Sequence, residues 1–161
     1  DLAAVGRQLA QRLALEFIDS DAEIEARTGV DIAYIFEREG EAGFRSREAE
    51  VIDALSRRDR VLVSTGGGAI LDASTRERLR ARGRVVYLRT SVDQQLARTR
   101  RSSDRPLLNN DDPRGTLERL FEQRAPLYTE VAEIVVDTDG RKVKAVVDQI
   151  CHQLGIDGVE P

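Results

Sequence analysis

Apolar residues recur with two different periods along this chain, and the two periods alternate. Four short apolar runs bounded by polar or turn residues predict strands, over Glu16–Ile18, Val61–Val63, Val85–Leu88 and Glu133–Val136. Segments with helical spacing separate them: Val5–Leu15, two short helices broken at Gly29 and Gly40, a longer helix to about Arg58, a helix ending at Gly83, and Lys142–Leu154. We therefore predict an α/β fold in three layers, α/β/α, around a central, mostly parallel sheet.

Polar residues predict where three further helices begin. The predicted starts are Ser74 with Glu77 as a capping box, Ser91 with Gln94, and Asp112 followed by Pro113.

Composition favours one globular domain over residues 1–156, with 157–161 as an exposed tail. Hydrophobic residues make up 40% of the 161 and charged residues 34%. A net charge of −4, only 4% aromatic residues and no Trp argue against nucleic-acid or anionic-membrane partners. No apolar run approaches the roughly 20 residues of a membrane span. The single cysteine, Cys151, excludes an internal disulfide, so we expect a cytoplasmic protein.

The second predicted strand ends in three glycines, Gly66, Gly67 and Gly68. Glycine lets backbone N–H groups approach a ligand with no Cβ in the way, and ligands bind at this end of the strands in open α/β sheets. The alternative is a flexible turn.

Two carboxylates follow the first predicted strand, at Asp19 and Asp21. One can hold a metal-bound water while the other contacts a substrate hydroxyl. Alternatively, Asp21 is the N-cap of the next helix.

Arg45 and Glu48 lie one helical turn apart in Phe44-Arg45-x-x-Glu48. The pair is either a surface ion pair worth about 0.2–0.5 kcal/mol, or a guanidinium held by Glu48 and directed at a carboxylate substrate.

Further arginines lie in a loop and beside a proline. Residues 98–108 carry four arginines, which suits a phosphoryl-transfer lid or a solvated, partly disordered loop. Pro126 predicts a break or kink in a helix just after Arg124, so this guanidinium is either presented at a distortion or part of a plain surface helix.

Together these motifs run in the order Asp-x-Asp, Phe-Arg-x-x-Glu, Thr-Gly-Gly-Gly, Arg-Pro-Leu-Leu and Arg-x-Pro-Leu-Tyr. From about Val5 to Gly155 the series resembles the shikimate kinase family, which are P-loop kinases of the nucleoside-monophosphate-kinase type. The resemblance implies a five-stranded parallel sheet, substrate-binding helices over about 21–58 and a lid over about 100–115. It implies a monomer that uses ATP and Mg²⁺ to phosphorylate the 3-hydroxyl of shikimate in aromatic amino acid biosynthesis.

The resemblance also implies a role for each motif residue. Asp21 would bind and help deprotonate the attacking hydroxyl, Asp19 would hold a water on Mg²⁺, and Arg105 would contact the transferring phosphoryl group. Shikimate would be bound by Asp21, Arg45, Gly66, Gly67, Gly68 and Arg124, and the nucleotide by Arg98, Arg105 and Arg141.

One motif of that family does not occur in these 161 residues: G-x-x-x-x-G-K-[ST], which binds nucleotide phosphates and Mg²⁺ between the first strand and first helix. Leu2 stands at its Lys position and Ala3 at its hydroxyl position. The strand before the motif lies inside the sheet of this family. We therefore expect a sequence that is incomplete or altered at its N-terminus, with four strands that surround a gap or slide together in a new register.

Three functions fit this sequence. The first is a shikimate kinase, inactive or impaired as written. The second is a non-catalytic shikimate-binding domain, and the third is another small-molecule P-loop kinase such as a gluconate kinase.

Overall fold

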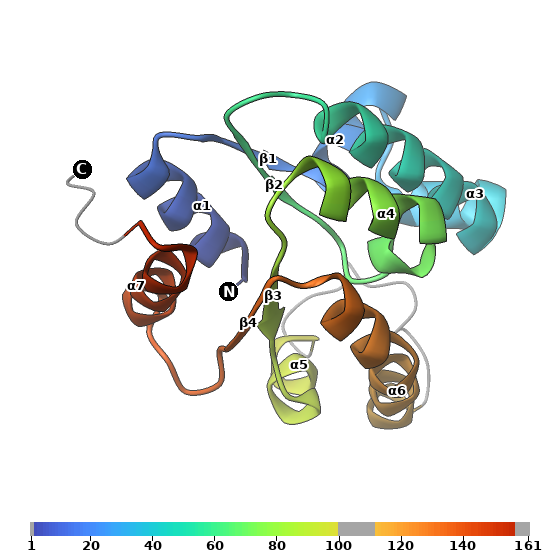
Figure 1. Cartoon of the computed structure of the whole chain (residues 1–161). Coiled ribbons are helices and arrows are strands. Elements are labelled where there is room, and N and C mark those ends of the chain that lie inside the picture. Colours follow the sequence, from blue (N-terminus) through green and yellow to red (C-terminus); the bar gives the residue numbers. More distant parts are fainter. Residues whose placement is uncertain (1, 100–111, 157–161) are drawn as a thin grey trace.

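The computed structural model describes residues 2–99 and 112–156 (Figure 1). Its helices and strands alternate as the sequence predicts. In chain order they are α1 (Leu2–Leu13), β1 (Glu16–Asp19), α2 (Ser20–Thr28), α3 (Ile32–Leu55), β2 (Val61–Ser64), the 3₁₀ turn η1 (Ala69–Leu71), α4 (Ala73–Arg82), β3 (Val86–Arg89), α5 (Val92–Thr99), α6 (Pro113–Val131), β4 (Ile134–Asp137) and α7 (Val143–Leu154).

The strands form two parallel pairs. β1 pairs with β2, which places Asp19 opposite Ser64, and β3 pairs with β4, which places Arg89 opposite Asp137. Within the described residues no strand ladder joins β2 to β3. Of the two arrangements expected from the sequence, the structure therefore has the gap, and the strands have not moved together into a new register.

One hydrophobic core lies between α1, α7 and the strands. Val5 and Leu9 of α1 meet Val136 of β4 and the α7 residues Val146 and Val147 there. Leu62 of β2 and Leu88 of β3 border the same core, so it holds the two strand pairs together across the gap. Each large aliphatic side chain buried in this way contributes about 1.5–3 kcal/mol.

A second core lies on the opposite face of β2. Ile24 of α2, Phe44 and Leu55 of α3, and Val61 and Val63 of β2 belong to it. Successive residues of a strand point to opposite faces, so β2 contributes to both cores. Figure 1 shows α1 and α7 on one side of the strands and α3 and α4 on the other, as a three-layer fold requires.

One local prediction was wrong. Asp72, and not Ser74, caps α4: its backbone is extended and its carboxylate accepts the Thr75 N–H at 2.9 Å, so Ser74 already lies in the first turn. α6 continues through Pro126, with Leu117 and Val131 buried on either side of the proline, so of the predicted break or kink the break does not occur. Tertiary packing thus overcomes the loss of one backbone hydrogen bond there.

The other two predicted helix starts are confirmed. Ser91 Oγ accepts the Gln94 N–H at 3.2 Å, and Asp112 accepts the Gly115 N–H at 3.1 Å, with Pro113 in the first turn. None of the described helices is long and apolar enough to cross a membrane.

Candidate functional site

The site lies at the carboxyl ends of β1 and β2. α2 begins directly after β1, and the three glycines follow β2 by way of Thr65. The glycines form a tight turn into η1, in which Ala69 N–H donates to the Gly66 carbonyl at 3.2 Å and Leu71 N–H to the Gly68 carbonyl at 3.1 Å. The turn is therefore held by its own hydrogen bonds.

Five side chains lie against this turn, in ordinary contact at Gly66 and closer than a Cβ allows at Gly67 and Gly68. A Cβ at Gly66 would lie 3.4 Å from Glu48 Oε2 and 3.5 Å from Asp21 Oδ1. A Cβ at Gly68 would collide with the guanidinium of Arg45.

The middle glycine is crowded from the side of α6. A Cβ at Gly67 would lie 3.1 Å from Arg124 NH1 and 2.9 Å from the Tyr128 hydroxyl. The structure thus brings Asp21, Arg45 and Arg124 together around the three glycines, as predicted. Close approach, rather than a flexible turn, explains the glycines.

Arg45 is held in place by a buried carboxylate. Its NH1 donates to Glu48 Oε1 at 2.9 Å, and Glu48 is only 2% exposed. The guanidinium also lies 5.1 Å from the centre of the Phe44 ring. A surface ion pair would leave both partners in solvent, so the burial of Glu48 favours the positioned guanidinium.

Burial also sets the protonation of Glu48. Removal from water raises the pKa of its carboxyl, the Arg45 guanidinium opposes the rise, and the nearby Asp21 carboxylate adds to it. Two carboxylates and two guanidinium groups therefore share one small volume beside the glycines.

Three buried polar atoms at the glycine turn have no hydrogen-bond partner among the described residues: Arg124 Nε, Glu48 Oε2 and Arg45 Nε, which reaches Glu41 Oε1 only as an ion pair at 3.6 Å. Buried polar atoms are normally paired, so this group points to a ligand. The Nε–H groups of two arginines suit an anion such as a carboxylate, and carboxylate oxygens suit hydroxyl groups. The arrangement fits a small acid that carries hydroxyls.

Asp19, and not Asp21, caps α2. Its Oδ1 accepts the Asp21 N–H at 3.0 Å, so the simple N-cap alternative applies to Asp19. Asp19 still ends β1 at the edge where ligands bind. Within residues 2–99 and 112–156, no three His, Cys, Asp or Glu side chains gather as a metal site, so Asp19 would be a lone carboxylate toward a metal ion.

Only two of the three predicted nucleotide-binding residues lie among the described residues. Arg98 lies in the last turn of α5, and Arg105 lies outside the described residues. Arg141 donates to the carbonyls of Asp137 at 3.1 Å and Ala145 at 3.3 Å, within its own turn between β4 and α7.

Sequence reasoning assigned no role to Tyr128, although its motif was noted. The Tyr128 hydroxyl donates to the Gly67 carbonyl. The signal was available, because residues four apart in a helix share a face and Arg124 lies four residues before Tyr128.

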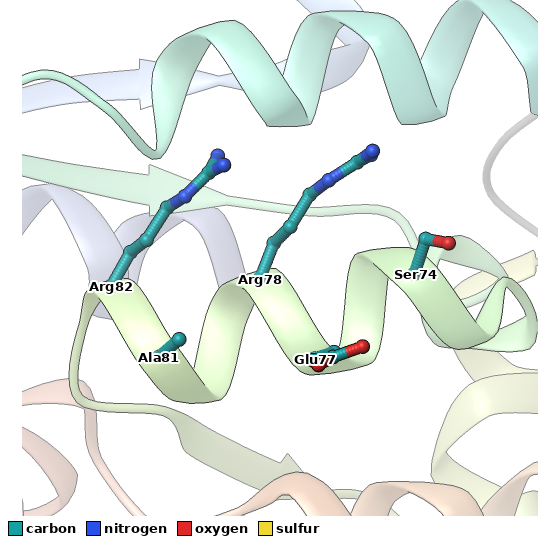
Figure 2. Close-up of a pocket in the computed structure, with 5 residues that line it drawn as sticks. All are labelled: Ser74, Glu77, Arg78, Ala81 and Arg82. Atoms are coloured by element: carbon teal, nitrogen blue, oxygen red, sulfur yellow. The ribbon is translucent and has the colours of Figure 1, made fainter.

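A separate surface pocket of about 320 Å³ lies on α4, and none of the predicted substrate-binding, nucleotide-binding or metal-binding residues lines it. Figure 2 shows two of its arginines, Arg78 and Arg82, extending from α4 toward α3. The Asp53 carboxylate of α3 forms ion pairs with both arginines: its Oδ1 lies 3.6 Å from Arg78 Nε and 2.7 Å from Arg82 NH1. The pocket therefore borders an ion-pair network that ties α4 to α3.

A parallel α/β fold whose guanidinium and carboxylate groups surround a glycine turn at the strand ends defines a class: α/β proteins with a polar ligand site at this edge of the sheet. A family model described as shikimate kinase matches residues 3–155. The shikimate kinase of Shewanella amazonensis is 54% identical over 153 residues, 95% of this chain and 90% of that protein. That of Halorhodospira halophila is 57% identical over 152 residues, 94% and 86% of the two chains.

Solved structures agree with these relatives. A shikimate kinase from Acinetobacter baumannii, in complex with shikimate, superposes with a TM-score of 0.92 at 45% identity and covers 97% of this chain and 87% of that one. The shikimate kinase of Aquifex aeolicus superposes with a TM-score of 0.81 at 35% identity, covering 94% and 88%. The chain belongs to the shikimate kinase family. The predicted fold class and enzyme class are confirmed, and the gluconate kinase alternative is disfavoured.

Proposed function

We propose that this chain binds shikimate at the glycine turn and serves the transfer of the ATP γ-phosphoryl group to the shikimate 3-hydroxyl. The observation that carries the proposal is the set of buried, unpartnered polar atoms on Arg45, Arg124 and Glu48. A carboxylate with a hydroxylated ring supplies acceptors for the arginines and donors for the carboxylates. Without a ligand these atoms stay unsatisfied, which costs free energy.

Each group has a distinct part in binding the acceptor. Arg45 and Arg124 approach neighbouring glycines and together bind the carboxylate, which excludes neutral polyols. Asp21 orients the 3-hydroxyl and receives its proton during attack. The backbone of Gly66, Gly67 and Gly68 forms the wall against which the ring lies.

ATP and Mg²⁺ are proposed for the donor side. When bound, Mg²⁺ would supply positive charge that stabilises the phosphates during transfer. Asp19 would hold a water on the ion, Arg98 and Arg141 would contact the nucleotide, and Arg105 would contact the moving phosphoryl group. The residues present fit this donor only in part, because the 161 residues contain no G-x-x-x-x-G-K-[ST] motif.

We therefore propose that the 161-residue chain by itself binds shikimate but transfers phosphate slowly at best. Phosphoryl transfer depends on positioned phosphates, and the described residues have a gap between β2 and β3.

A non-catalytic shikimate-binding domain is the second candidate, since the acceptor groups are complete in either case. We propose that the chain acts as a monomer. We place it in the cytoplasm, where its one cysteine, buried Cys151, stays reduced.

The test measures shikimate-dependent ADP release by two purified proteins of confirmed mass. The first begins at Asp1, and the second carries a strand and a G-x-x-x-x-G-K-[ST] segment before it. We expect turnover in the second and little in the first. If the second binds shikimate yet shows no turnover, the binding-domain alternative is favoured, and if neither protein binds shikimate, the proposal is wrong.

A further inference from the structure

Tyr128 joins three parts of the molecule at the edge of the candidate site. It extends from α6, four residues after Arg124, and its hydroxyl donates to the Gly67 carbonyl. Its ring stacks on Tyr87 of β3, with 4.5 Å between ring centres and 26° between the planes. One side chain therefore connects the glycine turn after β2, the helix that carries Arg124 and the strand on the far side of the gap.

The hydrogen bond fixes the middle of the glycine turn. A glycine peptide has little steric restraint of its own, so a hydrogen bond from a rigid ring restricts how the Gly67 carbonyl can rotate. Burial raises the pKa of the Tyr128 phenol, although the Arg124 guanidinium opposes the rise, so the hydroxyl remains a donor at neutral pH.

Arg124 depends on the same contact. The space beside Gly67 is occupied by Arg124 NH1 and the Tyr128 hydroxyl together, and Arg124 Nε has no partner among the described residues. If the Tyr128 hydroxyl is removed, both the Gly67 peptide and the guanidinium beside it gain room to move. A guanidinium binds a carboxylate well only when its N–H groups are correctly directed.

We propose that Tyr128 is a positioning residue for recognition of the acceptor's carboxylate: through the Gly67 carbonyl and the stack on Tyr87 it holds the glycine turn and Arg124 in the arrangement that binds this group. The inference rests on the proposed function, since it assumes that the carboxylate of shikimate is the ligand of Arg124.

The test compares the 161-residue chain with Tyr128→Phe, which keeps the ring and its stack and removes only the hydroxyl. Calorimetric titrations use shikimate and its neutral methyl ester. We expect Tyr128→Phe to weaken shikimate binding about tenfold. Binding of the ester is expected to change little, so the preference for the free acid falls by a similar factor. A general loss of structure would weaken both ligands alike.

Tyr34→Phe is the matched control, because it removes the hydroxyl of an exposed tyrosine at the start of α3, whose ring lies against Arg38 and not at the glycine turn. It is expected to bind both ligands as the unaltered chain does. Thermal unfolding is followed for every variant, so that a folding defect is recognised.

Gly67→Ala approaches the same contact from the other side and keeps the inference testable if Tyr128→Phe folds poorly. Its methyl group would lie 2.9 Å from the Tyr128 hydroxyl, so the preference for the free acid should fall. The double variant Gly67→Ala with Tyr128→Phe no longer has the Tyr128 hydroxyl in the way of the added methyl group. The effects of the two changes on the preference for the free acid are therefore expected to be non-additive.

Unchanged preference for the free acid in Tyr128→Phe, or an equal loss in Tyr34→Phe, overturns the inference while the proposed function stands. Failure of the unaltered chain to bind shikimate overturns both.

Discussion

The two strand pairs of this molecule differ in how far their functional groups are assembled. Around β1 and β2, side chains from α2, α3 and α6 meet at three glycines, and buried polar atoms there have no hydrogen-bond partner among the described residues. Around β3 and β4, Arg141 donates hydrogen bonds to carbonyl groups of its own turn, and Arg98 lies in the last turn of the short helix α5. Under the proposed function, the comparison teaches that the described residues gather the groups assigned to the acceptor, whereas they do not gather those assigned to the donor.

The physical reason lies in what holds each set of groups. Arg45 is fixed by buried Glu48, and the glycine turn is fixed by its own hydrogen bonds and by Tyr128. Such contacts exist before any ligand arrives, so the acceptor site is preorganised and little ordering is needed on binding.

The largest expected effect is the loss of an acceptor guanidinium. Arg45→Ala removes a ligand of the carboxylate and leaves the buried Glu48 carboxylate unpaired. Breaking a buried pair in this way costs about 3–5 kcal/mol, so both stability and shikimate affinity should fall, the affinity by about 100-fold or more. Thermal unfolding and calorimetric titration measure the two effects.

Arg47→Ala is the matched control for that change. Arg47 lies two residues further along α3 and pairs with Glu39 at 2.7 Å on the exposed face. Its removal should leave shikimate affinity unchanged, and an equal loss in both variants would show that α3 itself, rather than the Arg45 guanidinium, had been disturbed.

Gly68→Ala should have the next largest effect. The added methyl group collides with the Arg45 guanidinium, which must then leave its position beside Glu48. We expect about a tenfold loss of shikimate affinity by titration, with a smaller effect on folding. Gly83→Ala is the control, since a Cβ there meets nothing within 4 Å. If Gly68→Ala binds as tightly as Gly83→Ala, the close-approach explanation of the glycines is wrong.

A smaller effect is expected in the pH dependence of stability. The pKa of Glu48 is raised by burial, so its carboxyl keeps its proton in the folded state after the unfolded chain has lost it. The free energy of unfolding should therefore fall as pH rises from the ordinary value of 4.5 and level off above the raised pKa.

Paired surface carboxylates, whose pKa values are lowered, give the opposite trend, since their stabilisation is lost as pH falls. Denaturant titrations of the unaltered chain and of Glu48→Gln isolate the buried group by difference. Parallel curves for the two proteins would contradict the assigned role of burial.

The smallest expected effect lies in the pocket on α4, away from both strand ends. Asp53→Asn weakens the ion pairs of Asp53 with Arg78 and Arg82, which are partly exposed and screened by salt. The melting temperature should fall slightly at low salt and less at high salt, and shikimate affinity should not change. A clear loss of affinity would connect this network to the acceptor site.

Much of this arrangement is predictable from local sequence. The four strands follow from short apolar runs, and Asp21, Arg45 and Arg124 from motifs beside them. Local patterns do not report three-dimensional neighbours, and the errors follow from that. The burial of Glu48 depends on how α3 packs over β2, and Tyr128 gains its role only when α6 reaches the glycine turn. At Ser74 a better-placed cap two residues earlier decided the helix start, and α6 stays continuous through Pro126 where a break was one of the two expectations.

The most direct test of the account is a calorimetric titration of the 161-residue chain with shikimate, repeated with Arg45→Ala and Arg124→Ala. The account predicts saturable binding of one shikimate per chain, lost in both variants and independent of any turnover. Absence of binding by the unaltered chain, or binding that neither variant weakens, would contradict the claim that these residues form a complete acceptor site.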